Sequence, residues 1–417
     1  MSDKSQDPRT LSAGLLSVAE ARARIDKLVE PIGNVEKLPI RNALNRVLAT
    51  PIVSAINVPP HTNSAMDGYA VRGADLPGSG TARLNVIGRA MAGAPFAGEV
   101  GDSEAVRIMT GAVLPNGADT VLMQEDVRVD GDRIEIDSGH KPGENVRMAG
   151  EDLAVGEIVL VPGKQLLPAE IGVLASLGIA EVQVKHRLRA AFFSTGDELK
   201  SLGERLEPGQ IYDSNRYTLH GMLSRLNTEI VDLGVIRDER DAIRSAFREA
   251  ATQADVVITS GGVSVGEADF VKQTLDEIGQ VDFWKIAMKP GKPLAFGKVG
   301  DALFFGLPGN PVSVMATFYQ FVQPALQKMM GMSEPTALTL KVPCAVDLKK
   351  SPGRLEYQRG ILQHDEQGNM QVTSTGRQGS HVLSSMSKSN CFIILPAECA
   401  GVRRGDLVEV QPFAGLV

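Results

Sequence analysis

The chain has 417 residues, which at roughly 100 to 200 residues per domain is enough for about two to four domains, each with its own core. Its 43% hydrophobic and 22% charged residues are typical of a folded protein and exclude a largely disordered chain. The formal net charge of −7 gives no general attraction to nucleic acid or anionic membranes, so an anionic ligand would need a local cluster of basic residues.

Cysteine usage and the N-terminal sequence bear on location. None of the three cysteines is in a CxxC pair, which argues against a zinc ribbon or a disulfide framework and fits a reducing compartment. The first ten residues are polar, and no apolar run reaches the roughly 18 residues that a membrane span needs. We therefore expect a cytoplasmic protein with neither nucleic acid nor a membrane as its partner.

Two changes of pattern divide the N-terminal half. Residues 11–48 are predicted to be helical, with Ser17 as an N-cap, because apolar residues recur near helical spacing. Residues 51–150 hold short β-prone runs separated by glycine and proline, and the Asp130-Gly131 pair predicts a hairpin. We expect a packing arm and then a β-rich module, followed by a short helix that begins at Pro168.

Strands and helices alternate between about residues 189 and 331. Short, continuously apolar strands between amphipathic helices are typical of a parallel sheet with helices on both faces, and ligands collect at the carboxyl ends of such strands. The expected strands are residues 189–195, 229–236, 254–260, 293–299 and 302–307, and the expected helices are residues 214–227, 239–253, 268–279 and 311–330.

The sequence from residue 334 onward is β-like again, with a predicted hairpin at 362–372 and a last strand at 406–413. Four modules fit the length of the chain. The expected fold class is therefore multidomain α/β plus β, in which a central doubly wound α/β domain has a mostly parallel sheet and the C-terminal domain is β.

Unusual loops follow the apolar strands of the α/β segment. Gly196 stands at a tight turn after the first strand, with Asp197 and Glu198 beside it, although such residues also form plain helix-capping turns. After the strand 254–260, the loop SGGVSVGEAD lets consecutive backbone N–H groups converge on an anion. It lacks the spacing of a P-loop or of a dinucleotide-binding loop. Its candidate binding residues are Ser260, Gly261, Gly262 and Ser264.

Two further loops are candidates for the same anion site. Lys285, Lys289 and Lys292 surround a rigid KPGK turn and are candidate phosphate or oxyanion ligands, the alternative being that they are ordinary surface lysines. The sequence LPGNPVS runs from an apolar strand into a helix whose first N–H groups would point at the same cleft. The residues concerned are Pro308, Gly309, Asn310, Pro311 and Ser313.

Four carboxylates follow strands of this sheet, namely Asp197, Glu198, Asp238 and Asp269. Each by itself is commonly a cap or a turn residue. As a group beside lysines and free N–H groups, they suit a magnesium ion that bridges a phosphate, because Mg²⁺ takes oxygen ligands.

Two strings outside the α/β segment also carry polar candidates. The β-rich module begins with NSAMDGYAVR around Asp67, and RIMTGA contains Thr110 before a glycine. The C-terminal segment supplies arginines and serines on loops, and arginine suits oxyanions through its planar fork, although an exposed arginine is usually only solubilising. These residues are Arg354, Arg359, Arg377, Ser380 and Ser384.

Taken together and in this order, the longer motifs resemble the molybdopterin molybdenumtransferase family, the MoeA proteins and the related E domain of gephyrin. The resemblance runs from about residue 12 to the C-terminus. It implies insertion of molybdate, the second substrate, into adenylylated molybdopterin, with Mg²⁺ as cofactor and release of AMP. The motifs are NSAMDGYAVR, RIMTGA, MQED, FSTGDEL, GQIYDSN, SGGVSVGEADF, KPGKPLAFG, GLPGNPVS and GRLEYQRG.

The resemblance also implies a domain layout and an assembly. A discontinuous arm domain would cover residues 11–57 and 150–186 and carry a β-rich inserted domain at 58–149. An α/β molybdopterin-binding domain would follow at 187–332 and a C-terminal β domain at 333–417. Members of the family are homodimers whose active site takes the β module from the second subunit. Other molybdenum-cofactor proteins are expected as transient partners.

Carried over position by position, the resemblance implies specific roles. The catalytic residues would be Asp67, Glu198, Asp238 and Asp269, of which Asp238 and Asp269 would bind the metal. The substrate-binding set would add Thr110, Lys289, Lys292, Ser264, Arg354 and one of Ser380 or Ser384. Two other functions compete with this one, a molybdopterin adenylyltransferase and a non-catalytic scaffold like gephyrin.

Overall fold

The structure, a computed structural model, describes residues 14–262, 270–333 and 337–413. Contacts divide the chain into two units. The large unit comprises Met1–Glu36, Asn45–Val47 and Lys185–Val417, and the small unit comprises Lys37–Leu44 and Leu48–Val184. Among the described residues, none of the helices is both long and apolar enough to cross a membrane.

A six-stranded sheet lies at the centre of the large unit. Four neighbouring strands are parallel, which agrees with the mostly parallel sheet that the sequence predicts. The strand at 293–299, however, runs antiparallel to its neighbours, and the edge strand at 279–285 was not predicted because polar residues alternate along it. The strand order is β16 (Glu229–Ile236), β13 (Arg189–Thr195), β17 (Val256–Ser260), β21 (Ala302–Leu307), β20 (Pro293–Val299) and β18 (Gly279–Lys285).

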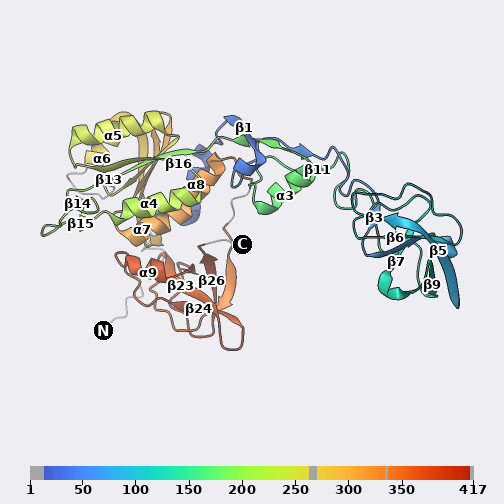
Figure 1. Cartoon of the computed structure of the whole chain (residues 1–417). Helices are drawn as coiled ribbons and strands as arrows, with labels where there is room; N and C mark the ends of the chain where they lie inside the picture. Colours follow the sequence, from blue (N-terminus) through green and yellow to red (C-terminus); the bar gives the residue numbers. More distant parts are fainter. Residues whose placement is uncertain (1–13, 263–269, 334–336, 414–417) are drawn as a thin grey trace. The chain divides into compact units, whose positions relative to one another are not determined.

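Helices cover both faces of this sheet, as the alternating pattern predicts (Figure 1). Along β13, Ala191 and Phe193 are buried with the helices of one face, and Ala190 and Phe192 with those of the other. The long helix predicted at 311–330 is confirmed, with a π-helical turn inside it. One face carries α5 (Arg240–Gln253) and α6 (Phe270–Ile278), and the other carries α4 (Ser214–Arg225), α7 (Pro311–Thr317), the π turn (Phe318–Val322) and α8 (Gln323–Met329).

The predicted N-terminal helix is shorter than expected. Helix α2 (Val18–Leu28) begins after Ser17, whose hydroxyl accepts a hydrogen bond from the backbone N–H of Glu20 at 3.1 Å. The prediction that helix extends to residue 48 is wrong, because Pro31 and Gly33 interrupt the pattern and β1 (Val35–Pro39) follows. Helix α2 packs into the α4 and α7 side of the large core.

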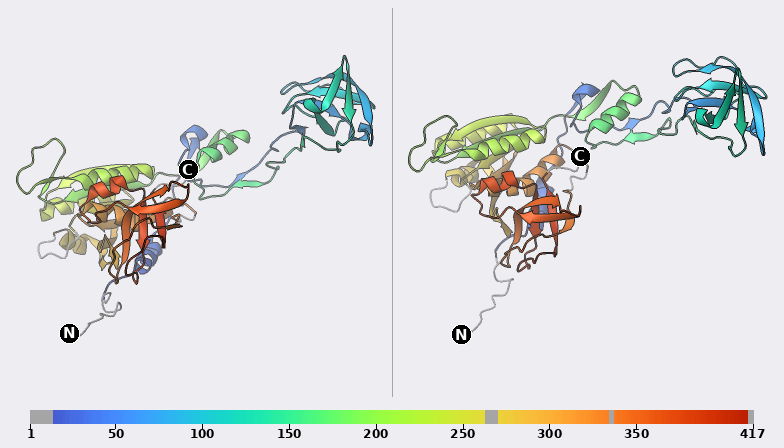
Figure 2. Two further views of the ribbon diagram at one scale, coloured as in Figure 1. Left: turned by 90° about the horizontal axis from the view of Figure 1, so that it is seen from below. Right: turned by 60° about the horizontal axis from the view of Figure 1, so that its bottom comes forward.

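The C-terminal domain is built on a second sheet of the large unit. The predicted hairpin is confirmed as the antiparallel pair β23–β24, and the predicted last strand as β26. Tyr357 and Phe392 of this domain share a core with Phe318 and Phe321 of the α/β domain, so the two domains pack directly on each other (Figure 2). The sheet order is β19 (Met288–Lys289), β23 (Leu355–His364), β25 (Cys391–Leu395), β26 (Leu407–Pro412) and β22 (Leu340–Pro343), with β24 (Met370–Ser374) on β23 and α9 (Leu383–Lys388) nearby.

The small unit contains a β-rich module and a separate helical core. The hairpin predicted at Asp130-Gly131 is confirmed, with Gly131 at a φ of 62°. Helix α3 (Pro168–Ser176) starts at the predicted proline. The module's sheet runs β7 (Thr120–Met123), β4 (Gly68–Val71), β6 (Glu104–Ile108), β5 (Thr81–Ala90), β9 (Arg133–Asp137) and β8 (Val127–Asp130), and short pairs join β3 (Asn63–Ser64) to β10 (Val146–Arg147) and β2 (Ile52–Val53) to β11 (Ile158–Leu160).

Candidate active site

A cavity of about 920 Å³ lies where the loops at one edge of the α/β sheet meet the C-terminal domain. The carboxyl ends of the parallel strands β13, β17 and β21 reach this edge. Because β20 is antiparallel to β21, its amino end lies at the same edge and brings the KPGKP turn there. The lining residues are Thr195, Gly196, Glu198, Asp238, Gly261, Gly262, Lys289–Pro293, Pro308–Asn310, Ser313, Arg354 and Gln378–Ser380.

Carboxylates gather at the end of the cavity beside β13 and β16. Glu198 and Asp238 line it, and the backbone N–H of Asp238 donates to Asp197 Oδ1 at 3.5 Å. Burial, together with the negative charges of Asp197 and Glu198, raises the pKa of the Asp238 carboxyl. Mutual repulsion of this kind is relieved by a bound cation, so these oxygens fit the magnesium ion that the sequence implies.

Glu198 and Asp238 are the carboxylates that line this end of the cavity among the described residues. Asp269, the second expected metal ligand, lies outside the described residues. Among the residues that the structure describes, no group of three His, Cys, Asp or Glu side chains is arranged to hold a metal ion. The magnesium site therefore stays a prediction.

The glycine-rich loop after β17 needs both of its first glycines. Gly261 and Gly262 have φ values of 92° and 66°, and a Cβ on Gly261 would lie 2.7 Å from the carbonyl oxygen of Thr195. Gly261 and Gly262 thus pack on the end of β13 and line the cavity. Ser260 is buried behind it rather than among the lining residues, and Ser264 lies outside the described residues.

Asn215, which the sequence analysis did not single out, joins two of the strand-end loops. Its Nδ2 donates to Ser260 Oγ at 2.8 Å and to the carbonyl oxygen of Gly309 at 2.7 Å. Because a carbonyl accepts only from a donor, the nitrogen of the amide must face Gly309. Helix α4, which begins at Ser214 just before this residue, is therefore tied to the loops after β17 and β21. Its position in GQIYDSN, one of the quoted motifs, is the signal that would have found it.

Two of the three candidate lysines line the cavity. Lys289 and Lys292 flank the turn, and Gly291 between them has a φ of 99° and packs so closely that a Cβ would lie 2.7 Å from Thr317 Oγ1. Lys285 is exposed and is not among the lining residues, so the structure does not bring it to the site.

The loop before α7 delivers a helix start to the cavity. Pro308, Gly309, Asn310 and Ser313 line it, whereas Pro311 occupies the first turn of α7 without lining the cavity. The backbone N–H of Val312 in this first turn donates to the carbonyl oxygen of Ser380 at 3.1 Å. This bond connects the α/β domain to the C-terminal loop.

The C-terminal domain contributes Arg354 and the loop Gln378–Ser380. Of the two serine candidates, Ser380 lines the cavity and Ser384 is exposed on α9 away from it. The sequence analysis missed Gln378 and Gly379, which no charge or motif distinguishes.

Arg359 holds this loop from behind. The backbone N–H of Arg359 donates to Gln378 Oε1 at 2.8 Å, and its guanidinium donates to the carbonyl oxygen of Gly379 at 3.2 Å and to Ser385 Oγ at 3.1 Å. The side chain is 1% exposed, and burial lowers the pKa of Arg359 to about 10. Arg359 is thus a support for the loop and not a lining residue.

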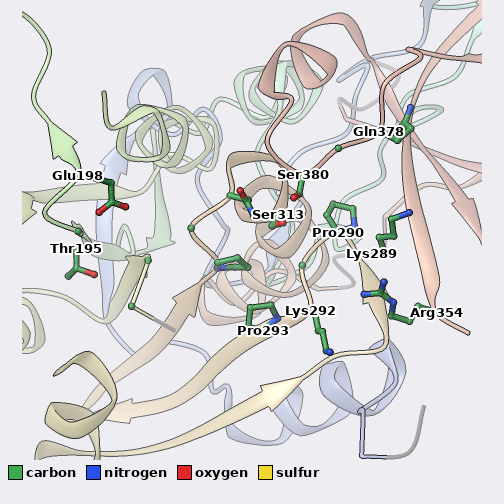
Figure 3. Close-up of a pocket in the computed structure, with 18 of the residues that line it drawn as sticks. Thr195, Glu198, Lys289, Pro290, Lys292, Pro293, Ser313, Arg354, Gln378 and Ser380 are labelled. Atoms are coloured by element: carbon green, nitrogen blue, oxygen red, sulfur yellow. The ribbon is translucent and has the colours of Figure 1, made fainter. Parts of the chain in front are cut away.

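The charges of the cavity are separated along its length (Figure 3). Glu198 lies at one end, Lys289, Lys292 and Arg354 lie at the other, and Ser313 and Ser380 lie between them. One cavity therefore offers oxygen ligands for a cation and cationic donors for an oxyanion.

Asp67 and Thr110 belong to the small unit, where they contact each other. The backbone N–H and the hydroxyl of Thr110 both donate to Asp67 Oδ1 at 2.7 Å. These two bonds lower the pKa of the Asp67 carboxyl, which favours the carboxylate, and within residues 14–262, 270–333 and 337–413 its hydrogen bonds are to Oδ1.

Comparison with known proteins places the chain among relatives. Residues 16–178 match the MoeA N-terminal region (domain I and II), residues 191–328 a probable molybdopterin binding domain, and residues 341–413 the MoeA C-terminal region (domain IV). The molybdopterin molybdenumtransferase of Haemophilus influenzae is 48% identical over 405 residues, which are 97% of this chain and 100% of that protein. The chain belongs to the molybdopterin molybdenumtransferase family.

Solved structures and a gephyrin agree with this membership. A molybdopterin biosynthesis MoeA protein from Pyrococcus horikoshii has 31% identity and a TM-score of 0.83, covering 96% of this chain and 100% of that one. The gephyrin of Dictyostelium discoideum is 34% identical over 96% of this chain, which spans 62% of that protein. The family resemblance stated from the motifs is therefore confirmed.

Proposed function

We propose that this member of the molybdopterin molybdenumtransferase family is itself such a transferase, which inserts molybdate into adenylylated molybdopterin and releases AMP. The observation that carries the proposal is the separation of charge in the 920 Å³ cavity. Adenylylated molybdopterin contains a pyrophosphate, which would be bound through a metal ion held by carboxylates. Molybdate is a dianion, which would be bound directly by basic side chains. The cavity offers both kinds of partner within one space.

The basic end would bind the oxyanion. Lys289, Lys292 and Arg354 supply positive charge there, and the hydroxyls of Ser313 and Ser380 supply neutral donors beside them. Donors fixed by the fold stabilise a developing charge without having to reorganise during the reaction. Molybdate would thus be held next to the position at which it is transferred.

The acidic end would bind the pyrophosphate through Mg²⁺. Asp238 and Asp269 would hold the ion, which, when bound, neutralises charge on the phosphate oxygens. Glu198 lies at the same end and would accept the proton of the water that attacks the phosphorus of the adenylyl group. The phosphoanhydride P–O bond would then break, so that AMP leaves and the phosphate stays on molybdopterin. The two dithiolene sulfurs would bind molybdenum in place of one molybdate oxygen, which leaves as water with the two thiol protons.

The wider proposal includes the assembly and the β module. We propose that the enzyme works as a homodimer, that Asp67 takes part in the reaction, and that Thr110 keeps Asp67 ionised and oriented. The lowered pKa of the Asp67 carboxyl, which favours the carboxylate, supports this role. Transfer of substrate and product to other molybdenum-cofactor proteins in the cytoplasm belongs to the same proposal.

Release of AMP from adenylylated molybdopterin by the purified protein, with and without molybdate, tests this function. We expect release that depends on both molybdate and Mg²⁺. Formation of the adenylylated pterin from ATP and molybdopterin, without any molybdate requirement, would instead indicate an adenylyltransferase. Failure of the intact protein to restore molybdoenzyme activity in a strain that lacks the transferase would favour a scaffold.

A further inference from the structure

A buried carboxylate of the C-terminal domain contacts one of the cavity's lysines. Glu356 Oε1 lies 3.0 Å from Lys289 Nζ. The Glu356 side chain is 6% exposed, whereas the Lys289 side chain is 51% exposed. The acid is therefore the fixed partner of the pair and the lysine is the accessible one.

The backbone holds this pair in register. Strand β19 pairs in parallel with the start of β23, which sets Lys289 opposite Glu356. The backbone N–H of Leu355 donates to the carbonyl oxygen of Ala287 at 3.0 Å, and Gln358 Nε2 donates to Glu356 Oε1 at 3.3 Å. The carboxylate and the lysine are thus both anchored to the C-terminal sheet, the carboxylate on β23 and the lysine on β19, just before the KPGKP turn.

Glu356 approaches Lys289 from outside the main cavity. Lys289 lines both the main cavity and a smaller one of about 360 Å³, whereas Glu356 lines only the smaller one. An oxyanion in the main cavity and Glu356 would therefore compete for the same ammonium group from two sides. Because the Glu356 side chain is only 6% exposed, water screens its charge less than it screens a charge on the surface.

A transferase gains little from binding its oxyanion too tightly. Affinity that is equal in the bound substrate and in the transition state lowers KM without raising kcat. A carboxylate that offsets part of the charge on Lys289 would weaken ground-state binding while keeping the ammonium in place.

We propose that Glu356 is a positioning residue that holds Lys289 at the cavity wall and sets the affinity of the site for the oxyanion. This inference rests on the proposed function, because it assumes that the basic end binds molybdate. It assigns a role to the acid of the GRLEYQRG motif, which contacts Lys289 and not the substrate.

The direct test is a calorimetric titration of the purified full-length protein with molybdate alone, which measures the dissociation constant. Glu356→Gln removes the charge but keeps an oxygen that accepts from Lys289. We expect the dissociation constant to fall about fivefold or more, as for loss of one nearby opposing charge. In the AMP-release assay, KM for molybdate should fall while kcat does not rise. Glu366→Gln, an exposed acid at the β23–β24 turn, changes the net charge equally and should leave the dissociation constant unchanged.

A double-mutant cycle shows whether the effect passes through Lys289. Lys350 also lies near Glu356. Burial lowers the pKa of the Lys350 ammonium, and the negative charge of Glu356 opposes this shift. In a Lys289→Gln background, Glu356→Gln should no longer change molybdate binding. An equal gain in affinity in that background would overturn the proposal, because the effect would then run through another group.

Further outcomes are separated as follows. If the wild-type protein binds molybdate and folded Glu356→Gln binds it equally, this inference fails and the proposed function stands. If the wild-type protein does not bind molybdate at all, the proposed oxyanion site fails and this inference with it. Should Glu356→Gln not fold, Glu356→Asp, which withdraws the carboxylate by one methylene, is expected to give a smaller fall in the dissociation constant, and an unchanged value would overturn the proposal.

Discussion

The acidic and basic ends of the cavity are built in different ways. At the acidic end, the backbone N–H of Asp238 donates to Asp197 Oδ1 at 3.5 Å, and burial together with repulsion from Asp197 and Glu198 raises the pKa of the Asp238 carboxyl. At the basic end, Lys289 is paired with a buried acid. The nearby loop that carries Ser380 is bonded both to Arg359 and to the start of α7.

The difference between the two ends shows that the basic end is the preorganised one. Bonds between the C-terminal loop and the start of α7 set the positions at the basic end before any ligand arrives, whereas the acidic carboxylates repel each other and, in the proposed function, would be stabilised by a bound cation. We therefore expect mutations at the acidic end to change the requirement for Mg²⁺, and mutations at the basic end to change the requirement for molybdate. The predictions below test that division.

The largest effect is expected from Asp238→Asn. If Asp238 holds the metal as proposed, loss of its carboxylate should lower the rate of AMP release about 100-fold or more and raise the Mg²⁺ concentration needed for half-maximal rate. The matched control is Asp241→Asn on α5, whose side chain is 93% exposed. A folded Asp238→Asn protein with the wild-type rate would remove Asp238 from the metal site.

A smaller effect is expected from Lys289→Ala. Removing one of the cations that surround the oxyanion should raise KM for molybdate about tenfold or more, with little change in the Mg²⁺ requirement. Lys298→Ala, at an exposed position of β20, serves as the control for loss of a lysine. Steady-state AMP release at varied molybdate concentration measures KM for both variants. An unchanged KM in Lys289→Ala would exclude Lys289 from the oxyanion site.

Asn215→Ala tests the tie between the strand-end loops. The substitution removes two hydrogen bonds and leaves the carbonyl oxygen of Gly309 without this donor, so the free energy of unfolding should fall by about 1 to 3 kcal/mol. Denaturant unfolding measures this loss. Since Gly309 lines the cavity, KM for the substrates should also rise. Full stability with unchanged kinetics would show that the tie has no role.

The smallest effect concerns pH and stability. The pKa of Asp238 is raised above its ordinary value of 3.8, so the folded state binds this proton more tightly than the unfolded state. Ionisation of Asp238 therefore destabilises the fold as pH rises from the ordinary value through the raised one. Without Mg²⁺, Asp238→Asn should raise Tm at pH 7 by about 1 °C, and the gain should shrink as pH falls through the raised pKa and vanish below the ordinary value of 3.8. A Tm of Asp238→Asn below that of the wild-type protein at pH 7 would contradict the claim that ionised Asp238 destabilises the fold.

Much of the α/β architecture follows from local sequence. The strand at 302–307 is apolar and buried throughout, and the strand at 189–195 is buried after its exposed Arg189, which distinguishes both from the amphipathic helices. The direction of β20 is not local information, since its parallel and antiparallel versions have the same apolar pattern. Edge strand β18 alternates polar and apolar residues, and its assignment depends on pairing with β20.

The site was predictable where residue chemistry is distinctive and a motif is long. Lys289, Lys292, Gly261 and Gly262 reach the cavity as expected. The choice of Ser380 over Ser384 depends on the start of α9, and the pairing of Lys289 with Glu356 joins residues 67 positions apart. Such contacts arise from the packing of one domain on another, which residue patterns do not encode locally.

The division between the two ends is tested most directly by measuring AMP release over a grid of molybdate and Mg²⁺ concentrations. Wild-type protein, Asp238→Asn and Lys289→Ala would be compared on the same grid. The account predicts that Asp238→Asn shifts the curve along the Mg²⁺ axis and Lys289→Ala shifts it along the molybdate axis. Shifts of both variants along both axes to the same extent would contradict it, because the two ends would then not have separate roles.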